Sequence, residues 1–204
     1  MRRKIAEEFA GPMLPFIAFC VALNLTVGQI TALLKLPVYL DSIGTVLLAV
    51  LSGPISAIVA GSFANLIASA FGNPPMMFFI PVVVVIGGVS GVIAKLGWFR
   101  RWYLIVLGGI LLGIPTAALS SVISAYVFGG VTMGAADFIV LFFRSQGFTL
   151  HQSTLFQAFI MDPVDKIITY LVVFAVVRNL PQRLLHRFPG AGNVRHQQPD
   201  IHAS

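Results

Sequence analysis

Long apolar segments, separated by short breaks rich in glycine, proline or polar residues, occupy most of this 204-residue chain. The segments lack the regular polar face of a soluble helix, and the longer ones reach the roughly 20 residues needed to cross a hydrocarbon core of about 30 Å. The pattern predicts an all-α membrane protein with six transmembrane helices. The expected spans are residues 13–34, 43–53, 54–71, 77–97, 103–128 and 155–177.

Two of the expected spans are short. Residues 43–53 and 54–71 would extend about 17 and 27 Å, and a tight turn at Gly53-Pro54 separates them. Short spans occur where neighbouring helices bury irregular backbone or line a cavity. The loop at 129–153 is too long for a simple hairpin, and we expect it to fold over the mouth of that cavity.

Basic residues predict the orientation of the chain. Ten of the 13 Lys and Arg residues fall in three clusters, at residues 2–4, 95–101 and 178–195. Because basic loops stay on the cytoplasmic side, both termini are expected to be cytoplasmic, in the inner membrane of a bacterium. This topology also accounts for the net charge of +6, so no nucleic-acid partner is expected. Residues 1–188 form the expected membrane domain, and residues 189–204 a disordered cytoplasmic tail.

Motifs for catalysis are absent from the sequence. It contains no G-x-x-x-x-G-K-[ST], no H-E-x-x-H and no G-x-S-x-G, and its single cysteine, Cys20, lies in an apolar run. We therefore expect neither enzymatic activity nor a metal or other cofactor.

Three ionisable residues lie inside the last expected span. An ionised group at the centre of a membrane helix costs about 2.5–3.5 kcal/mol, so Asp162, Asp165 and Lys166 need a reason to be there. Asp162 and Lys166 are four positions apart and are expected to pair on one helix face. Asp162-Pro163 also has the pattern of an N-cap followed by proline at the first helical position, which would interrupt this span. A structural anchor and a ligand-binding or proton-transfer role both remain open.

Polar residues in the predicted outer loops are further candidates. Tyr39, Asp41 and Asn73 lie in loops above the two short helices, and Arg144 lies in the long loop. Asp41 or Ser42 could also cap the helix that begins at residue 43. A small-molecule site needs a few oriented polar groups between apolar walls, and these residues could supply them.

Two stretches resemble a known family of membrane proteins. The run from Leu36 to Val46 (LPVYLDSIGTV), followed by Gly53-Pro54, is similar to the substrate-binding S components of energy-coupling factor (ECF) transporters, most of all the cobalamin-type branch. The sequence DPVDK at 162–166 also fits that branch. The resemblance covers about residues 5–188.

This resemblance implies a six-helix bundle that binds a vitamin or related micronutrient at the outer face, with cobalamin the first substrate to consider. The implied partners are a transmembrane coupling subunit, which would contact Ala18 and Ala22, and two ABC ATPases, in addition to membrane lipid. A membrane sensor module and a solitary micronutrient carrier are the alternatives. The substrate-binding residues expected are Tyr39, Asp41, Asn73, Arg144, Asp162 and Lys166.

Overall fold

The computed structural model describes residues 8–9, 13–132 and 134–194, and these residues form helices and loops without a strand. Each of the six predicted segments contains a helix, and the prediction of an all-α chain is confirmed. The elements are α2 (Met13–Leu33), α3 (Ile43–Leu51), α4 (Pro54–Ala70), η1 (Pro74–Phe79), α5 (Ile80–Lys95), η2 (Trp98–Arg100), α6 (Trp102–Phe128), α7 (Asp137–Ser145), α8 (Leu150–Asn179), α9 (Gln182–Leu185) and η3 (Ala191–Asn193).

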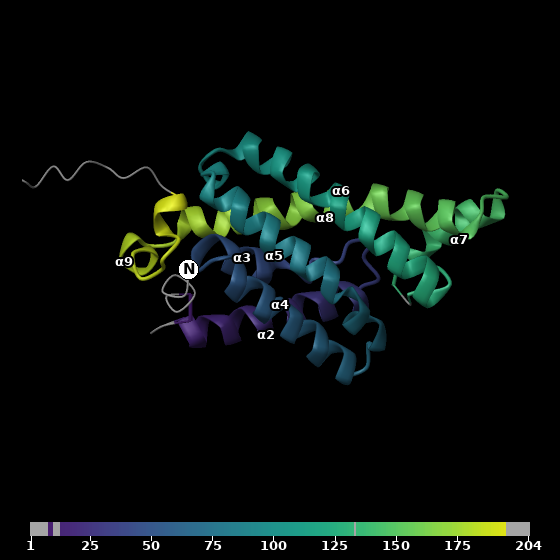
Figure 1. The fold of residues 1–204 in the computed structure, drawn as a ribbon, viewed down its shortest axis with the longest axis horizontal. Helices are drawn as coiled ribbons and strands as arrows, with labels where there is room; N and C mark the ends of the chain where they lie inside the picture. The colour runs from purple at the N-terminus through teal and green to yellow at the C-terminus, as the bar shows by residue number, and fades with distance from the viewer. Residues whose placement is uncertain (1–7, 10–12, 133, 195–204) are drawn as a thin grey trace, which may run out of the picture.

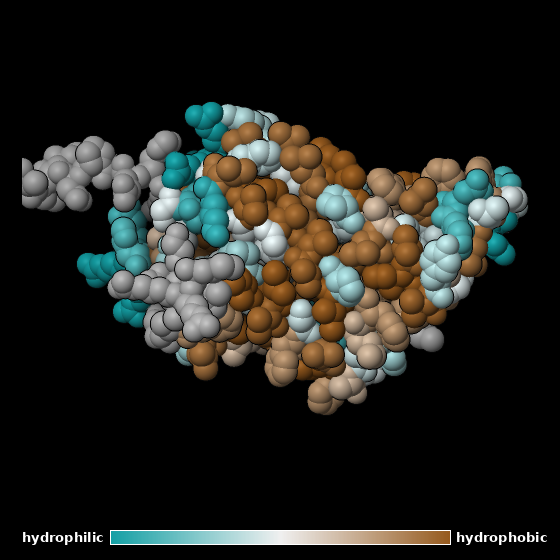
Figure 2. Space-filling model, viewed as in Figure 1, coloured by the Kyte–Doolittle hydropathy of each residue, from teal (hydrophilic) through white to brown (hydrophobic). Residues whose placement is uncertain are grey.

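In the described part of the chain, three helical stretches are long and apolar enough to cross a membrane. They are Met13–Leu33, Pro74–Lys95 and Trp102–Phe128. An apolar surface covers the middle of the molecule in Figure 2, between two ends where polar residues gather. These features are those of a membrane protein.

The helices pack around α3 and along the pair formed by α6 and α8. Every residue of α3 is buried, and this short helix contacts α2, α4, α5 and α8. α6 and α8 lie side by side along the long axis, and the first half of α8 extends with α7 beyond the group formed by α2 to α5 (Figure 1).

Glycines permit the close contact between α6 and α8. A Cβ atom at Gly109 would lie 2.7 Å from Cα of Ile167, and one at Gly113 would overlap the backbone of Pro163. The two glycines are four residues apart and therefore share one face of α6, as in the small-x-x-x-small pattern of membrane helix pairs.

We expect Gly109→Ala and Gly113→Ala each to lower the thermal unfolding temperature in detergent, since crowding a packed contact costs about 1–3 kcal/mol. Gly88→Ala in α5 is the matched control, because a Cβ atom there meets nothing within 4 Å. Alanine favours a helix over glycine by about 1 kcal/mol, so Gly88→Ala should not be destabilising. Equal unfolding temperatures for all three variants would contradict the close α6–α8 contact.

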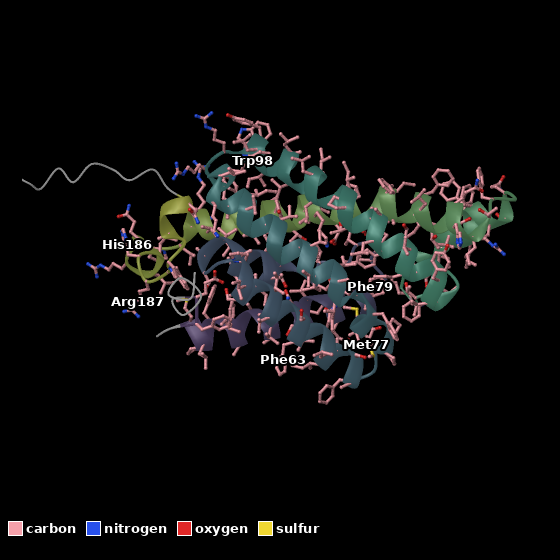
Figure 3. The ribbon with its side chains drawn as sticks, viewed as in Figure 1. Phe63, Met77, Phe79, Trp98, His186 and Arg187 are labelled. Carbon is pink, nitrogen blue, oxygen red and sulfur yellow. The ribbon has the colours of Figure 1, made fainter. Side chains whose placement is uncertain are left out.

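Basic residues gather at one end of the molecule. Arg100 and Arg101 lie in the connection from α5 to α6, and Arg183 and Arg187 lie in and after α9. Figure 3 shows Trp98, His186 and Arg187 at this same end. We call it the basic end, defined by Lys95, Arg100, Arg101, Arg178, Arg183 and Arg187, and the opposite end the far end.

The segment after α9 is ordered up to Val194. The backbone N–H of Gly190 donates to the carbonyl of Leu51 at 2.8 Å, and Arg100 donates to the carbonyl of Gly192 at 2.6 Å. Val194 is only 7% exposed. Residues 189–194 of the expected disordered tail therefore contact α3 and the α5–α6 connection in the structure, and residues 195–204 lie outside the described part.

Glu8, which precedes α2, bonds to the turn between α3 and α4. Its carboxylate accepts the backbone N–H groups of Ile55 and Ser56, both at 2.9 Å, and its carbonyl accepts the hydroxyl of Ser52. A negative charge at the first turn of α4 is favourable because helix N–H groups there lack partners. This contact fixes Glu8 to the turn between α3 and α4.

Candidate functional site

α8 presents a buried polar face to the rest of the bundle. The helix is continuous from Leu150 to Asn179 and passes through Pro163 without a break. The expected interruption at Asp162-Pro163 is therefore wrong. Proline removes one backbone N–H, and the close packing of Gly113 against Pro163 supports the helix at that point. The buried polar residues of α8 are Ser153, Thr154, Gln157, Asp162, Asp165, Lys166 and Thr169.

Asp165 holds the loop between α2 and α3 against α8. Its Oδ1 atom accepts the backbone N–H groups of Tyr39 at 2.9 Å and Leu40 at 2.8 Å. Leu40 has φ of 49°, an unusual conformation for a residue with a side chain that costs about 1–3 kcal/mol. Thr31 in α2 donates to the carbonyl of Tyr39 at 2.7 Å. Side chains from two helices thus fix this strained loop.

Lys166 pairs with Asp165, its neighbour in sequence. Its Nζ atom lies 2.6 Å from Oδ2 of Asp165 and 3.2 Å from the hydroxyl of Ser42. The expected pair between Asp162 and Lys166 does not form; Asp162 instead accepts a hydrogen bond of 2.6 Å from Ser120 in α6. The physical reason is that Asp162 faces α6, whereas the flexible lysine side chain reaches the loop where Ser42 and Asp165 meet.

Tyr39 and Asp41 complete the group from the loop side. The phenolic oxygen of Tyr39 accepts a hydrogen bond of 2.9 Å from Gln157. Asp41 is partly buried against Gly28, and it lies close enough to Lys166 for their charges to interact.

We call this group the polar cluster. It contains three carboxylates and one ammonium group. The two oxygens of Asp165 bond the backbone of the loop and the ammonium group of Lys166. Asp165 lies about 20 Å from Arg178, a residue of the basic end, along the axis of α8. Its members are Tyr39, Asp41, Ser42, Ser120, Gln157, Asp162, Asp165 and Lys166.

The cluster can bind a ligand through hydrogen bonds and charge. Among the described residues, no group of three or more His, Cys, Asp and Glu side chains is placed to hold a metal ion. A hollow of about 280 Å³ lies between α6 and α8 on the side of the cluster toward the far end. It is lined by Ser121, Val122, Ala125, Tyr126, His151, Gln152, Thr154 and Leu155.

The structure brings together four of the six residues expected to bind substrate: Tyr39, Asp41, Asp162 and Lys166. Asn73 is exposed at the turn before η1, and Arg144 is exposed in the last turn of α7; no described hydrogen bond or ion pair joins either to the cluster. Within the long connection at 129–153, residues 137–145 form α7, which packs mainly against α8 among the described elements.

Four residues of the cluster were not among the expected binding residues: Ser42, Ser120, Gln157 and Asp165. The spacing of polar residues at 157, 162, 165, 166 and 169 could have indicated one buried helix face. Ser120 has no comparable signal in the sequence. No protein-family model, curated protein or solved structure matches the chain.

Proposed function

We propose that this protein is the substrate-binding subunit of an ECF-type importer, which captures a vitamin or related micronutrient at the outer face of a bacterial inner membrane. The observation that carries the proposal is the polar cluster. Ionisable groups at membrane depth are costly and mark ligand or ion sites. A separate coupling subunit and two ABC ATPases would deliver the substrate to the cytoplasm, and cobalamin is the first substrate to test.

The distribution of charge supports the proposed orientation. The basic end would face the cytoplasm, with six crossings by α2, α3, α4, α5, α6 and α8. In this orientation α8 would carry three ionisable residues within the membrane. Their charged groups bond to Ser120, to the loop before α3 and to each other, so none would face lipid without a partner. The hollow between α6 and α8 would then open on the outer side of the cluster.

Within the cluster, the proposal assigns different duties to different residues. Asp165 is occupied by two backbone N–H groups and by Lys166, so it serves the structure. Asp162 has one side-chain partner, Ser120, and Tyr39 has one, Gln157. Asp162 and Tyr39 therefore have the capacity to exchange or add partners when a substrate binds.

Ligand binding to the purified protein in lipid nanodiscs tests this function. Titration calorimetry with cobalamin, followed by a panel of other vitamins, should identify one ligand that binds tightly. Tyr39→Phe and Asp162→Asn should each weaken its binding about tenfold, equivalent to about 1.4 kcal/mol. Asn73→Ala is the control, since its exposed side chain lies outside the cluster, and it should bind as the unmodified protein does.

Thermal unfolding of each variant without ligand separates binding from folding. Tyr39→Phe retains the ring and the backbone N–H that Asp165 accepts, so its unfolding temperature should change little. Unchanged affinity in both cluster variants, or the absence of any vitamin ligand, would contradict the proposed site.

A further inference from the structure

α7 has two apolar faces, and among the described elements it packs mainly against α8. Val140 is 2% exposed, and Phe143 packs against Phe156 of α8, with ring centres 4.9 Å apart. On the opposite face, Phe138, Leu141 and Phe142 are 71%, 55% and 59% exposed. These three residues follow helical spacing and form one stripe, which we call the outer stripe.

The position of α7 along α8 places the outer stripe at the membrane boundary. Phe156, which contacts Phe143, lies about 33 Å from Arg178 along the helix axis. If the basic end marks one surface of a hydrocarbon core about 30 Å thick, α7 lies at the opposite surface, in the interfacial layer. α7 is nine residues long and, unlike the equally short α3, which neighbouring helices bury completely, it leaves one apolar face exposed, so it is not one of the proposed crossings.

The surroundings of the stripe match a lipid surface. Leu155, Phe159 and Ile160 of α8 are 43%, 41% and 45% exposed, so the apolar surface continues from α8 toward α7. The polar residues of α7 lie at its ends, with Asp137 in the first turn and Arg144 in the last. A basic residue beside an apolar stripe is suited to the phosphate groups of lipids.

Asp137 fixes how α7 enters this layer. Its carboxylate accepts the backbone N–H groups of Thr132 at 2.9 Å and Gly134 at 3.1 Å, and the hydroxyl of Thr132 at 3.0 Å. The connection from α6 is thus tied to the first turn of α7, and the direction of the stripe is set by the fold.

We propose that α7 is an interfacial helix, which inserts Phe138, Leu141 and Phe142 into the lipid leaflet at the far end and places Arg144 among the headgroups. The occupant of this face is bilayer lipid. In this position α7 would hold its connection to α8 at the membrane surface.

Fluorescence from a single tryptophan tests the proposal in the full-length protein. The two native tryptophans are first replaced, as Trp98→Phe and Trp102→Phe, and Phe142→Trp is then added. The protein is reconstituted in vesicles of phosphatidylcholine and phosphatidylglycerol. We expect a loss of emission with lipids brominated near the headgroup, a smaller loss with bromine near the chain ends, and little quenching by iodide in the buffer.

Phe143→Trp is the matched control on the inner face of the same helix, and it should be shielded from both quenchers because it packs against α8. Phe138→Trp is a second probe of the stripe and should behave as Phe142→Trp does. Quenching of both stripe probes by iodide alone would place the stripe in water and overturn the proposal. Protection from both quenchers would show that protein covers it, which also overturns the proposal.

Discussion

Replacing Lys166 by Met is expected to lower the free energy of unfolding by about 3–5 kcal/mol, because a buried charge would lose its partner. Lys166 is 4% exposed, and its ammonium group pairs with Asp165 at 2.6 Å. Without that group, Asp165 remains buried as an uncompensated anion while it still holds the loop at Tyr39 and Leu40. The measurement is reversible unfolding in mixed micelles, with retained helical content checked by circular dichroism.

The double variant Asp165→Asn, Lys166→Met distinguishes the ion pair from a simple packing effect. Removing both charges should recover part of the stability, because replacing a buried pair costs less than breaking it. Lys35→Met is the control for losing a lysine, since Lys35 is exposed in the loop and should contribute little. If Lys166→Met unfolds like the unmodified protein, or if the double variant is less stable than Lys166→Met, the assigned role of the pair is wrong.

The helices could be predicted from sequence because their signal is local. Apolar runs with glycine and proline at their boundaries place α3 and α4 within a few residues, as Gly53-Pro54 illustrates. The α6–α8 contact also has a local signal, since Gly109 and Gly113 are four residues apart, although that spacing alone does not name the partner helix.

The candidate site was harder to predict from the sequence because its contacts join residues that are far apart in the chain. The bond from Tyr39 to Asp165 joins residues 126 positions apart, and nothing near either residue identifies the other. Asp162 and Lys166 lie in a mainly apolar segment, so their burial could be expected, but their partners depended on which way α8 faces. Asn73 and Arg144 were selected because they lie in loops, and the position of a loop is set by the packing of the whole bundle.

Under the proposed transport function, Ala18→Trp or Ala22→Trp should abolish uptake while leaving ligand binding to the purified protein nearly unchanged. Both alanines are exposed on α2, and neither side chain faces the polar cluster in a described contact. Small residues allow a second helix to approach closely, so a bulky ring there would block docking of a coupling subunit. Uptake is measured with labelled ligand in cells that express the protein with its coupling subunit and ATPases.

Ala118→Trp provides the matched control, because Ala118 is also an exposed alanine on an apolar helix, but on α6. It should leave both uptake and binding intact, which would show that a tryptophan on the membrane surface is not harmful in itself.

Uptake by the unmodified protein should also require the ATPases, and accumulation of ligand by the purified chain alone in liposomes would favour a solitary carrier. Loss of ligand binding in both α2 variants would show instead that this face contributes to the substrate pocket, because docking cannot influence a measurement made without the coupling subunit.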